Sequence, residues 1–586
     1  MHLWIPVAAA TLFTFPSLCL GSLWHNDEQN PLSWLTTNHA SKQPNIIFIL
    51  TDDQDLHMNS LDHVPLIRKN LIEQAICCPA RVSVLTGRLS HNTNVTDVVP
   101  PYGGYPKFIS QGLNDAYLPV WLQDAGYNTY YTGKLFNAHG TNNYDKPFAN
   151  GWTQSDFLLD PYTYDYLNSS YQRNHDPPVS YEGQHTVDVL AYKALGFLDD
   201  AVKEDKPFFL GIAPVAPHSN LVFLKDFDEN APLPDPDSLL VTPPIPAARH
   251  ANLFKDLKVP RTPNFNPDKP SGVHWVSKLE KLTEEIVDYQ DHFYRQRLRA
   301  LQGVDELVED VVRRLEQYDL LDNTYIFYTT DNGYHLGQHR LGPGKECGFE
   351  EDINIPLIVR GPGVPVNTTT EIVTTHTDLS PTFLKLAGAR ARDDFDGLAI
   401  PLTESTIEDA LETRQEHVTV EFWGMGLFEG ESWGRQAFFL NNTYKAVRVV
   451  GKTHNLYYSV HCTHEHELYD LNTDPYQINN LLAVDSTATH ASGHPIEKIV
   501  SRLDSLLYVL KSCKSQTCVR PWEALHPLGN VATLADALSS RFDDFYATQQ
   551  RVHFEYCALG QLPAAEGPLF NSEWDVFRDD LRKELA

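Results

Sequence analysis

Two groups of polar side chains stand directly after apolar runs of the sequence and could bind a metal ion. Asp52 and Asp53 follow one apolar run, and Asp331 and Asn332 follow another. Because ligands in open α/β sheets bind beyond the carboxyl ends of the strands, these side chains could meet at one edge of a sheet. Their oxygens would suit one hard cation such as Ca2+. The alternative is that they cap helices or form turns, which is common for a lone Asp after a strand.

A pair of cysteines begins a segment that has the features of a short helix. Pro79 suits the first turn of such a helix, and Gly87 suits its end. Cys77 would then lie at the positive N-terminal pole, where an anion is stabilised. A thiolate of low pKa at this position could act as a nucleophile. The alternative is that Cys77 and Cys78 form an inert buried pair.

Three further side chains could bind or protonate an anionic group near the same edge. His218 follows the apolar run 208–213 through a stiff loop that contains two prolines. Lys134 follows the run 127–131, and Lys345 stands in a Gly-Pro-Gly-Lys sequence. Each of them alone is more typical of a structural histidine or a surface lysine. Taken with the acidic residues and the cysteine, they predict a divalent-metal hydrolase of anionic esters.

Apolar runs rich in Ile, Phe, Val and Tyr predict the strands that position these residues. Long segments of helical character separate the runs, which predicts an α/β fold with a mostly parallel sheet flanked by helices. Residues 277–318 predict one or two long surface helices, and the proline-rich residues 232–270 predict an irregular excursion over the surface. The clearest predicted strands are 45–50, 127–131, 208–213, 324–329 and 355–359.

The chain of 586 residues is too long for one ordinary hydrophobic core. The alternation of strands and helices weakens toward the C-terminus, where residues 438–450 and 456–460 have the pattern of antiparallel strands. The sequence therefore predicts a leader at 1–20, a catalytic domain at 21–400 and a smaller C-terminal α+β domain at 401–586.

The first twenty residues are almost uncharged and apolar, which predicts a signal peptide, with an uncleaved membrane anchor as the alternative. Four sequons for N-glycosylation agree with passage through the secretory pathway, although each is a weak signal alone. We therefore expect a glycoprotein that is secreted or resides in the lumen of the secretory pathway, with the lysosome or vacuole included. The sequons begin at Asn94, Asn168, Asn367 and Asn441.

Eight cysteines in a chain of this length do not make a disulfide scaffold. Cys513 and Cys518 lie close together in a polar stretch and predict a small disulfide loop, with two free thiols as the alternative. For Cys347, Cys462 and Cys557, no pairing follows from the sequence.

The formal net charge of −30 limits the partners that the chain can attract. It repels polyanions at long range, so we expect no nucleic-acid partner and no stable membrane partner. A long sulfated polysaccharide is also disfavoured. A local basic pocket can still bind one small anion.

The cysteine segment resembles the signature of the sulfatase family. A Cys-x-Pro-x-Arg run that starts at Cys77 is followed by Leu-Thr-Gly-Arg at 85–88, and in that family the first cysteine is oxidised to formylglycine. The likeness is strongest to fungal arylsulfatases and N-acetylglucosamine-6-sulfatases. It continues in the expected order through Thr51-Asp52-Asp53-Gln54, Gly133-Lys134, Ala216-Pro217-His218-Ser219, Thr330-Asp331-Asn332-Gly333-Tyr334-His335 and Glu467-Leu468-Tyr469-Asp470-Leu471-Asn472-Thr473-Asp474-Pro475.

The resemblance implies the fold of the alkaline phosphatase superfamily and a modified nucleophile. A formylglycine-generating maturation enzyme would convert Cys77 to the aldehyde, whose hydrated form would attack the sulfur of a small sulfated substrate. One Ca2+ per subunit would polarise the sulfate oxygens. The ligands of this ion would be Asp52, Asp53, Asp331, Asn332 and the modified Cys77.

The same resemblance implies roles for the basic residues. Arg81 would hold the hydrated aldehyde, and Lys134 and Lys345 would neutralise charge on the sulfate. His218 would protonate the departing oxygen.

One position departs from the family pattern. Many sulfatases have a histidine two residues after the lysine that corresponds to Lys134, whereas this chain has Phe136 there and Asn137 beside it. In the second step of the implied reaction, the other hydroxyl of the hydrated aldehyde loses its proton, sulfate leaves and the aldehyde is restored. The residue that accepts this proton is therefore open. His335 is the first substitute, and His139 is the second.

We expect hydrolysis of sulfate esters, and the acidic charge and the fungal resemblance favour small aryl sulfates. One alternative is an exo-sulfatase that acts on sugars of the N-acetylglucosamine-6-sulfate type. Another is a phosphonate or phosphate monoester hydrolase of the same superfamily. The non-enzymatic alternative is an inactive module that recognises sulfate.

Overall fold

The structure is a computed structural model that describes residues 43–65, 77–224, 239–430 and 437–570. The predicted leader at 1–20, and the anchor that is its alternative, lie outside these ranges. Within the ranges, every helix is too short or too polar to span a bilayer.

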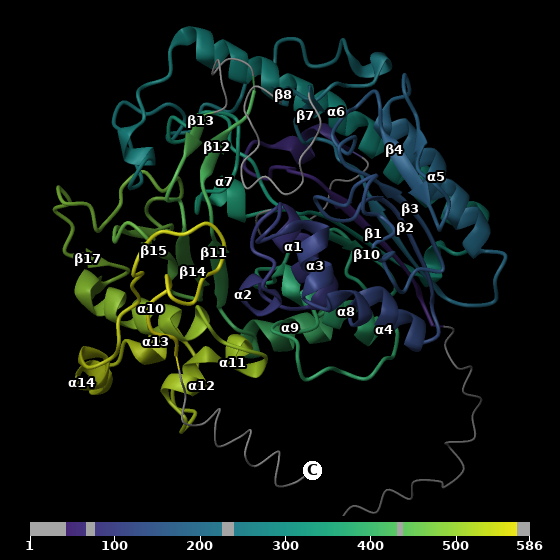
Figure 1. Cartoon of the computed structure of the whole chain (residues 1–586). Helices are drawn as coiled ribbons and strands as arrows, with labels where there is room; N and C mark the ends of the chain where they lie inside the picture. Colours follow the sequence, from purple (N-terminus) through teal and green to yellow (C-terminus); the bar gives the residue numbers. More distant parts are fainter. Residues whose placement is uncertain (1–42, 66–76, 225–238, 431–436, 571–586) are drawn as a thin grey trace, which may run out of the picture. The chain divides into compact units, whose positions relative to one another are not determined.

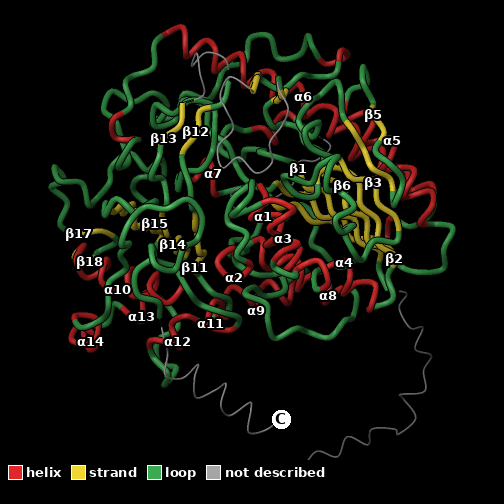
Figure 2. The backbone as a smooth tube through the Cα atoms, viewed as in Figure 1, coloured by secondary structure: helices red, strands yellow, loops and turns green. Residues whose placement is uncertain are grey.

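An eight-stranded sheet is the largest sheet of the described residues (Figures 1 and 2). Its strand order is β10-β9-β1-β6-β2-β3-β4-β5, and the strands from β9 to β3 run parallel to one another. The strands at both edges pair antiparallel. The predicted mostly parallel sheet is therefore confirmed. The strands are β1 Asn45–Thr51, β2 Asn128–Lys134, β3 Gln154–Leu158, β4 Ser170–Arg173, β5 Val179–Ser180, β6 Phe208–Ala213, β9 Thr324–Thr330 and β10 Leu357–Arg360.

The strand β2 continues past its predicted end at residue 131. Gly133 still pairs with Ala213 of β6, and its φ of 104° lies in the region that favours glycine. A Cβ atom on Gly133 would lie 2.1 Å from the Ala213 carbonyl oxygen, so glycine permits this close approach. Lys134 is consequently the last residue of β2 and does not belong to the following loop, where the sequence placed it.

Helices cover both faces of the large sheet, which explains why β1 is apolar at successive positions. Ile46 and Phe48 face one hydrophobic cluster, whereas Ile47 and Ile49 face another. Figure 1 shows α5 and α6 on one side of the sheet and α3, α4 and α8 on the other. The helices on the face of Ile46 and Phe48 are α1 Cys77–Thr86, α3 Gly104–Ser110, α4 Leu118–Asp124 and α8 Leu379–Leu386. Those on the face of Ile47 and Ile49 are α5 Thr186–Ala201 and α6 Glu284–Gln317.

The segment 277–318 forms one long helix, α6, rather than two. The Thr283 hydroxyl accepts a hydrogen bond from the Ile286 backbone N–H at 3.4 Å and caps its N-terminus. One face of α6 packs against the sheet and α5. The described part of the proline-rich excursion, 239–270, is mostly irregular, except for a short hairpin between β7 Asn220–Phe223 and β8 Leu239–Thr242.

A second, antiparallel sheet follows residue 400, in the order β11-β14-β15-β16. The predicted strand 438–450 is divided between β13 and β14, because Asn441 adopts a left-handed backbone conformation with φ of 65°. β13 pairs with β12 in a separate hairpin. The elements are β11 His417–Phe422, β12 Gly426–Phe428, β13 Ala437–Phe439, β14 Tyr444–Val450, β15 Asn455–His461, β16 His466–Asp470, β17 His490–Ala491, β18 His494–Pro495 and α10 Ile496–Leu510. The short helices are α2 Ser90–Thr93, α7 Glu350–Ile353, α9 Glu404–Thr413, α11 Gln516–Val519, α12 Pro521–Leu525, α13 Leu534–Ala537 and α14 Asp543–Ala547.

The small sheet packs against other elements on both faces. α10 and the segments after it cover one face. On the other face, Tyr457 and Tyr469 share a hydrophobic cluster with Trp275, Cys347 and Phe349, which precede residue 400. This cluster joins residues from both sides of the predicted domain boundary, and the boundary itself stays a prediction.

The predicted disulfide between Cys513 and Cys518 is confirmed. A second disulfide joins Cys462 to Cys557, which are 95 residues apart. No local pattern could have indicated that pair, because its members meet only through the packing of the C-terminal segments.

Candidate active site

The four polar side chains that follow β1 and β9 meet at the carboxyl edge of the large sheet. The two strands are parallel neighbours in register, so Asp52 and Asp331 lie side by side. The backbone N–H of Asp53 donates to Asp331 Oδ1 at 3.1 Å, and the Asn332 amide donates to Asp53 Oδ1 at 2.6 Å. All four side chains are fully buried. The structure therefore brings together the oxygens that the sequence proposed as metal ligands.

Two cations lie on these carboxylates. Arg81 lies one helical turn after Cys77, and its Nε donates to Asp331 Oδ2 at 2.7 Å. Lys134, at the end of β2, donates through Nζ to Asp52 Oδ2 at 2.6 Å. Both basic residues are buried, so their charges are matched to the carboxylates at close range.

Lys345 is a third cation at the same edge. Its Nζ lies 2.6 Å from both carboxylate oxygens of Asp53. The preceding residue, Gly344, pairs through its backbone with His335, which returns the loop to the sheet edge. The three predicted basic residues therefore all reach the acidic cluster.

The pKa values of Asp52 and Asp53 are lowered although both side chains are buried. Burial alone would raise the pKa of Asp52, but Lys134 and Arg81 outweigh it and lower that pKa. Burial likewise opposes ionisation of Asp53, and Lys345 reverses the effect, so the pKa of Asp53 is also lowered. Adjacent carboxylates of this kind are typical of sites that bind a cation.

Cys77 is the first described residue of α1, and its sulfur is directed at the acidic cluster. Its Sγ lies 3.5 Å from Asp52 Oδ1 and 3.4 Å from Asn332 Oδ1. Asp53 Oδ1 is slightly further away, at 3.8 Å. Cys78 packs instead in the hydrophobic core on that face of the sheet. A reactive group at position 77 would face the ligand oxygens, whereas one at position 78 would not.

The unmodified Cys77 thiol is not activated by its surroundings. Burial, and after it the negative charge of Asp331, raises the pKa of this thiol well above its ordinary value. The unmodified side chain therefore does not show the low-pKa thiolate that is one of the two interpretations of the sequence, because burial and the charge of Asp331 both raise its pKa.

The donor set at this edge suits Ca2+. Ligand atoms that lie within 4.8 Å of one another belong to Asp52, Asp53, Cys77 and His218. The carboxylate of Asp331 and the amide oxygen of Asn332 add further hard oxygen donors beside them. Several carboxylate and amide oxygens in one place are what Ca2+ prefers in proteins.

His218 reaches the edge from the loop after β6. Its Nδ1 lies 2.8 Å from the Ser219 carbonyl oxygen, which can only accept, so Nδ1 carries a hydrogen. Its Nε2 faces Asp53 Oδ2 at 3.6 Å. The ring of Tyr164 stacks on this imidazole, with 4.1 Å between centroids, and also lies 4.9 Å from the Lys134 ammonium. Tyr164 therefore fixes the plane of the imidazole that the sequence proposed as a proton donor.

The two residues that follow Leu135 point in different directions. Phe136 is buried in the hydrophobic core, where its ring lies 4.6 Å from that of Phe108. Asn137 donates to the Tyr164 hydroxyl at 2.8 Å. Asn137 is thus connected to the site through the ring that stacks on His218, whereas Phe136 is not.

His335 is held by a carboxylate. Its Nδ1 lies 2.8 Å and 3.0 Å from the two oxygens of Asp352, which also accepts from the Cys347 backbone N–H at 2.9 Å. Its Nε2 is buried and has no hydrogen-bond partner among the described residues. A Cβ atom on Gly344 would lie 3.3 Å from this nitrogen, so glycine leaves space beside it.

His139 lies in a different environment. Its ring packs against Tyr105 and Phe157, with centroid distances of 4.1 Å and 5.2 Å. Burial lowers its pKa to about 3. An imidazole of this pKa accepts a proton poorly at neutral pH, so His139 is the weaker of the two candidate bases.

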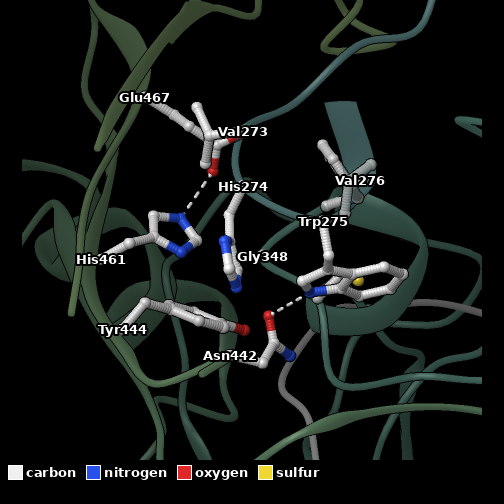
Figure 3. Close-up of a pocket in the computed structure, with 11 residues that line it drawn as sticks. Val273, His274, Trp275, Val276, Gly348, Asn442, Tyr444, His461 and Glu467 are labelled. Carbon is white, nitrogen blue, oxygen red and sulfur yellow. Dashed lines mark hydrogen bonds and ion pairs between the residues drawn. The ribbon is translucent and has the colours of Figure 1, made fainter. Parts of the chain in front are cut away.

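A small cavity lies between residues 273–276, 347–349 and the small sheet (Figure 3). Figure 3 shows His461 paired with Glu467, and the Trp275 indole donating to Asn442. Its lining includes none of the residues that form the acidic cluster or the basic groups around it.

Sequence reasoning missed three residues that complete the surroundings of the cluster. Tyr164 stacks on His218, as described above. Arg297 is buried in α6 and donates to the backbone carbonyl oxygens of Asp53 and Pro217. Glu429, just after β12, lies 3.7 Å from Lys345 Nζ. A buried arginine in a helix and a glutamate beside a glycine give no signal that separates them from ordinary surface residues.

Comparisons with known proteins agree with this geometry. The family model described as Sulfatase matches residues 44–389, and that described as N-sulphoglucosamine sulphohydrolase, C-terminal, matches residues 337–502. An arylsulfatase of Volvox carteri is 36% identical over 587 residues, which covers 93% of this chain and 85% of the relative. An N-acetylglucosamine-6-sulfatase of Capra hircus is 30% identical over 528 residues, which covers 82% of this chain and 86% of the relative.

A solved structure shows the same fold. The structure of BT4656 in complex with its substrate D-glucosamine-2-N,6-O-disulfate matches with a TM-score of 0.55 at 21% identity, and covers 76% of this chain and 94% of that chain. The resemblance stated from the sequence is confirmed by the family match and by the relatives. The chain belongs to the sulfatase family and is a sulfuric ester hydrolase.

Proposed function

We propose that this sulfatase hydrolyses small aryl sulfates with a formylglycine formed at Cys77 and one Ca2+ at the sheet edge. The observation that carries the proposal is the position of the Cys77 side chain. Its Sγ lies within 3.5 Å of oxygens of Asp52 and Asn332, which are two of the proposed calcium ligands. A nucleophile at that position and a cation on those oxygens would act on the same sulfate group.

The basic residues bind the anionic substrate and hold the position-77 side chain. When present, the hydrated aldehyde supplies a hydroxyl nucleophile and Ca2+ supplies a Lewis acid. Arg81 lies one turn along α1 from position 77 and is fixed by Asp331 at 2.7 Å, so it can hold the hydrate. Lys134 and Lys345 place two ammonium groups at the edge, where they neutralise charge on the sulfate.

His218 protonates the departing oxygen. Its Nδ1 donates to the Ser219 carbonyl, so Nε2 is the ring nitrogen that can deliver a proton to the alcohol or phenol. The net reaction converts the sulfate ester and water to an alcohol or phenol and hydrogen sulfate. The stacked Tyr164 ring limits rotation of the imidazole during this transfer.

His335 is the proton acceptor of the second step. Asp352 binds Nδ1 and thereby leaves the lone pair of Nε2 free to accept a proton. The buried position of Nε2, without a partner among the described residues, supports this role. The contrast with His139, whose pKa is about 3, favours His335 over that alternative.

The substrate class is tested by rates on matched esters. We expect kcat/KM for nitrophenyl sulfate to exceed that for nitrophenyl phosphate by about 100-fold or more. A higher value for the phosphate would contradict the proposal and favour the phosphomonoester alternative. A higher value for N-acetylglucosamine-6-sulfate than for nitrophenyl sulfate would favour the sugar alternative, which the Capra hircus relative supports.

We also propose that the chain is secreted and N-glycosylated after passage through the compartment that contains its maturation enzyme. Asn367 and Asn441 are exposed, and Asn94 and Asn168 are half-buried, so the first two are the better acceptors. Peptide mapping of the secreted protein before and after enzymatic deglycosylation tests this. Unmodified Asn367 and Asn441 would contradict it.

A further inference from the structure

A buried carboxylate from beyond the predicted catalytic domain lies beside the acidic cluster. Glu429 follows β12, and its side chain is 5% exposed. Its backbone N–H donates to the Pro343 carbonyl at 2.7 Å, so it is fixed to the loop that carries Lys345. A glutamate is rarely buried without partners, so the Glu429 carboxylate must be bound by polar or charged groups.

The two oxygens of Glu429 have different neighbours. Oε2 accepts hydrogen bonds from the hydroxyls of Ser219 and Tyr334, the latter at 2.8 Å. Oε1 lies 3.7 Å from Lys345 Nζ. One oxygen is therefore anchored by neutral donors, and the other is left to face the ammonium group.

The anchoring network around Oε2 is itself rigid. The ring of Tyr334 packs under the Arg297 guanidinium at 3.9 Å, and Arg297 donates to the carbonyl oxygens of Asp53 and Pro217. Ser219 directly follows His218 in the chain. The carboxylate is consequently placed by groups that also border the sheet edge.

Lys345 forms ion pairs with two carboxylates in the described part of the chain, and only one of them is a proposed calcium ligand. Asp53 holds the ammonium at 2.6 Å through both of its oxygens, yet these same oxygens are proposed ligands of Ca2+. A carboxylate that binds a divalent cation has less negative charge to offer an ammonium group. Glu429 remains as a carboxylate partner that is not among the proposed calcium ligands, and its distance of 3.7 Å leaves Nζ room to approach a sulfate oxygen.

We propose that Glu429 is a positioning residue that holds Lys345 for binding of the sulfate group. The inference rests on the proposed function, because it needs Asp53 as a cation ligand and Lys345 as a sulfate ligand. It adds that the segment after residue 400 contributes directly to the organisation of the active site. It also explains why a negative charge is tolerated beside an anion-binding site, since the charge fixes the cation that binds the anion.

A double-mutant cycle tests this. Glu429→Gln keeps an oxygen for the hydroxyls of Ser219 and Tyr334 but removes the charge that faces Lys345. We expect kcat/KM for nitrophenyl sulfate to fall about 10-fold, and the inhibition constant of inorganic sulfate to rise by a similar factor. In the Lys345→Ala background, Glu429→Gln should lower kcat/KM by less than about 2-fold, because the ammonium group that Glu429 positions is absent. The matched control, Glu421→Gln, removes the charge of another buried glutamate, which pairs with Lys445 in the small sheet, and kcat/KM should stay within about 3-fold of the wild type.

Equal losses from Glu429→Gln in both backgrounds would overturn the proposal. Glu429→Asp provides a second test, since it keeps the charge but shortens the side chain, whereas Gln keeps the length but loses the charge. We expect the Asp variant to retain more activity than the Gln variant, and the reverse order would contradict positioning by charge. Wild-type turnover and the aldehyde content at position 77 test the proposed function separately, so an additive cycle in an active, fully modified enzyme would contradict the role of Glu429 alone.

Discussion

Two buried clusters of charged side chains differ in how their charges are arranged. At the edge of the large sheet, Asp52, Asp53 and Asp331 lie against one another, and the backbone N–H of Asp53 donates to an oxygen of Asp331. In the small sheet, Glu421 of β11 accepts from Lys445 of β14 at 2.8 Å. Carboxylates are neighbours of one another in the first cluster, although Arg81, Lys134 and Lys345 also lie on them, whereas opposite charges alternate in the second.

The second cluster is explained by folding alone. His91 Nδ1 lies 2.9 Å from Glu421 Oε2, and the Lys445 ammonium packs 3.7 Å from the Trp423 ring centroid. Burial would raise the pKa of Glu421, but His91 and Lys445 reverse this and lower it to about 2. Each charge is compensated by the chain itself, so no ligand is needed to account for the arrangement.

The first cluster is not explained in this way. Neighbouring carboxylates repel each other, and basic side chains that are also proposed to bind sulfate are held on them. The fold keeps these groups together although the arrangement is unfavourable. Binding of a cation and an anion at this edge is the physical reason for it. Substitutions in the first cluster should therefore change activity, and those in the second should change stability.

The largest expected effect is that of Cys77→Ala. This change should lower kcat for nitrophenyl sulfate by about 10,000-fold or more and leave the thermal midpoint of unfolding nearly unchanged, because the nucleophile is lost. Cys78→Ala is the matched control and should keep substantial activity, since Cys78 packs in the core. An inactive Cys78→Ala with an active Cys77→Ala would reverse the assignment.

The next effect is that of removing a carboxylate from the edge. Asp331→Ala or Asp52→Ala should lose bound calcium and activity together, with kcat/KM about 1,000-fold lower, because a four-ligand oxygen site is opened. Elemental analysis of the purified variants measures the metal. Full calcium occupancy in both variants would contradict the assignment of these ligands.

A smaller and selective effect is expected for His218→Ala. Loss of a proton donor affects poor leaving groups most, so kcat/KM should fall about 100-fold or more for alkyl or sugar sulfates and much less for nitrophenyl sulfate. The slope of log kcat/KM against the pKa of the leaving group is the measurement. A slope equal to that of the wild type would remove His218 from the protonation step.

The smallest effect on activity is expected in the second cluster. Glu421→Gln should lower the free energy of unfolding by about 3 kcal/mol, because it removes the buried carboxylate that His91 and Lys445 share and leaves Lys445 only Glu566 at 3.7 Å, while kcat/KM stays within about 3-fold. Thermal unfolding followed in parallel with activity checks both expectations. A large loss of activity at unchanged stability would break the distinction between the two clusters.

The stability difference between wild type and Glu421→Gln should also depend on pH. The pKa of Glu421 falls from 4.5 to about 2 on folding, so its contribution is complete above pH 4.5 and is lost as the pH falls toward 2. The pKa of His91 is raised above 6.5 because Glu421 outweighs the effect of burial, so its contribution is present below 6.5 and is lost as the pH rises through the folded value. The difference should be greatest between about pH 4.5 and 6.5. A difference that does not vary between pH 3 and 6 would contradict this.

The edge cluster could be predicted from the sequence because strand ends are visible as transitions from apolar to acidic residues. Parallel strands in register then bring Asp52 and Asp331 together without any further information. The end of the helix that carries Cys77 followed from Gly87, and α1 ends at Thr86 accordingly.

The remaining site residues could not be predicted because they arrive through tertiary packing. Tyr164 and Glu429 come from segments whose approach to the edge depends on loops and on how the small sheet packs. The direction of Phe136 and Asn137 depends on where β2 ends, which the sequence placed too early. The pKa of the Cys77 thiol depends on burial and on carboxylates that only the fold brings near it.

The most direct test of the account is intact-peptide mass spectrometry across position 77 of the active enzyme. Conversion of cysteine to formylglycine replaces the CH2–SH group with an aldehyde, which lowers the mass of the peptide by about 18 Da and makes it reactive toward hydrazides. The account predicts this change at Cys77, with Cys78 unmodified, in proportion to the specific activity of each preparation. A fully active preparation that retains the unmodified Cys77 thiol would contradict it.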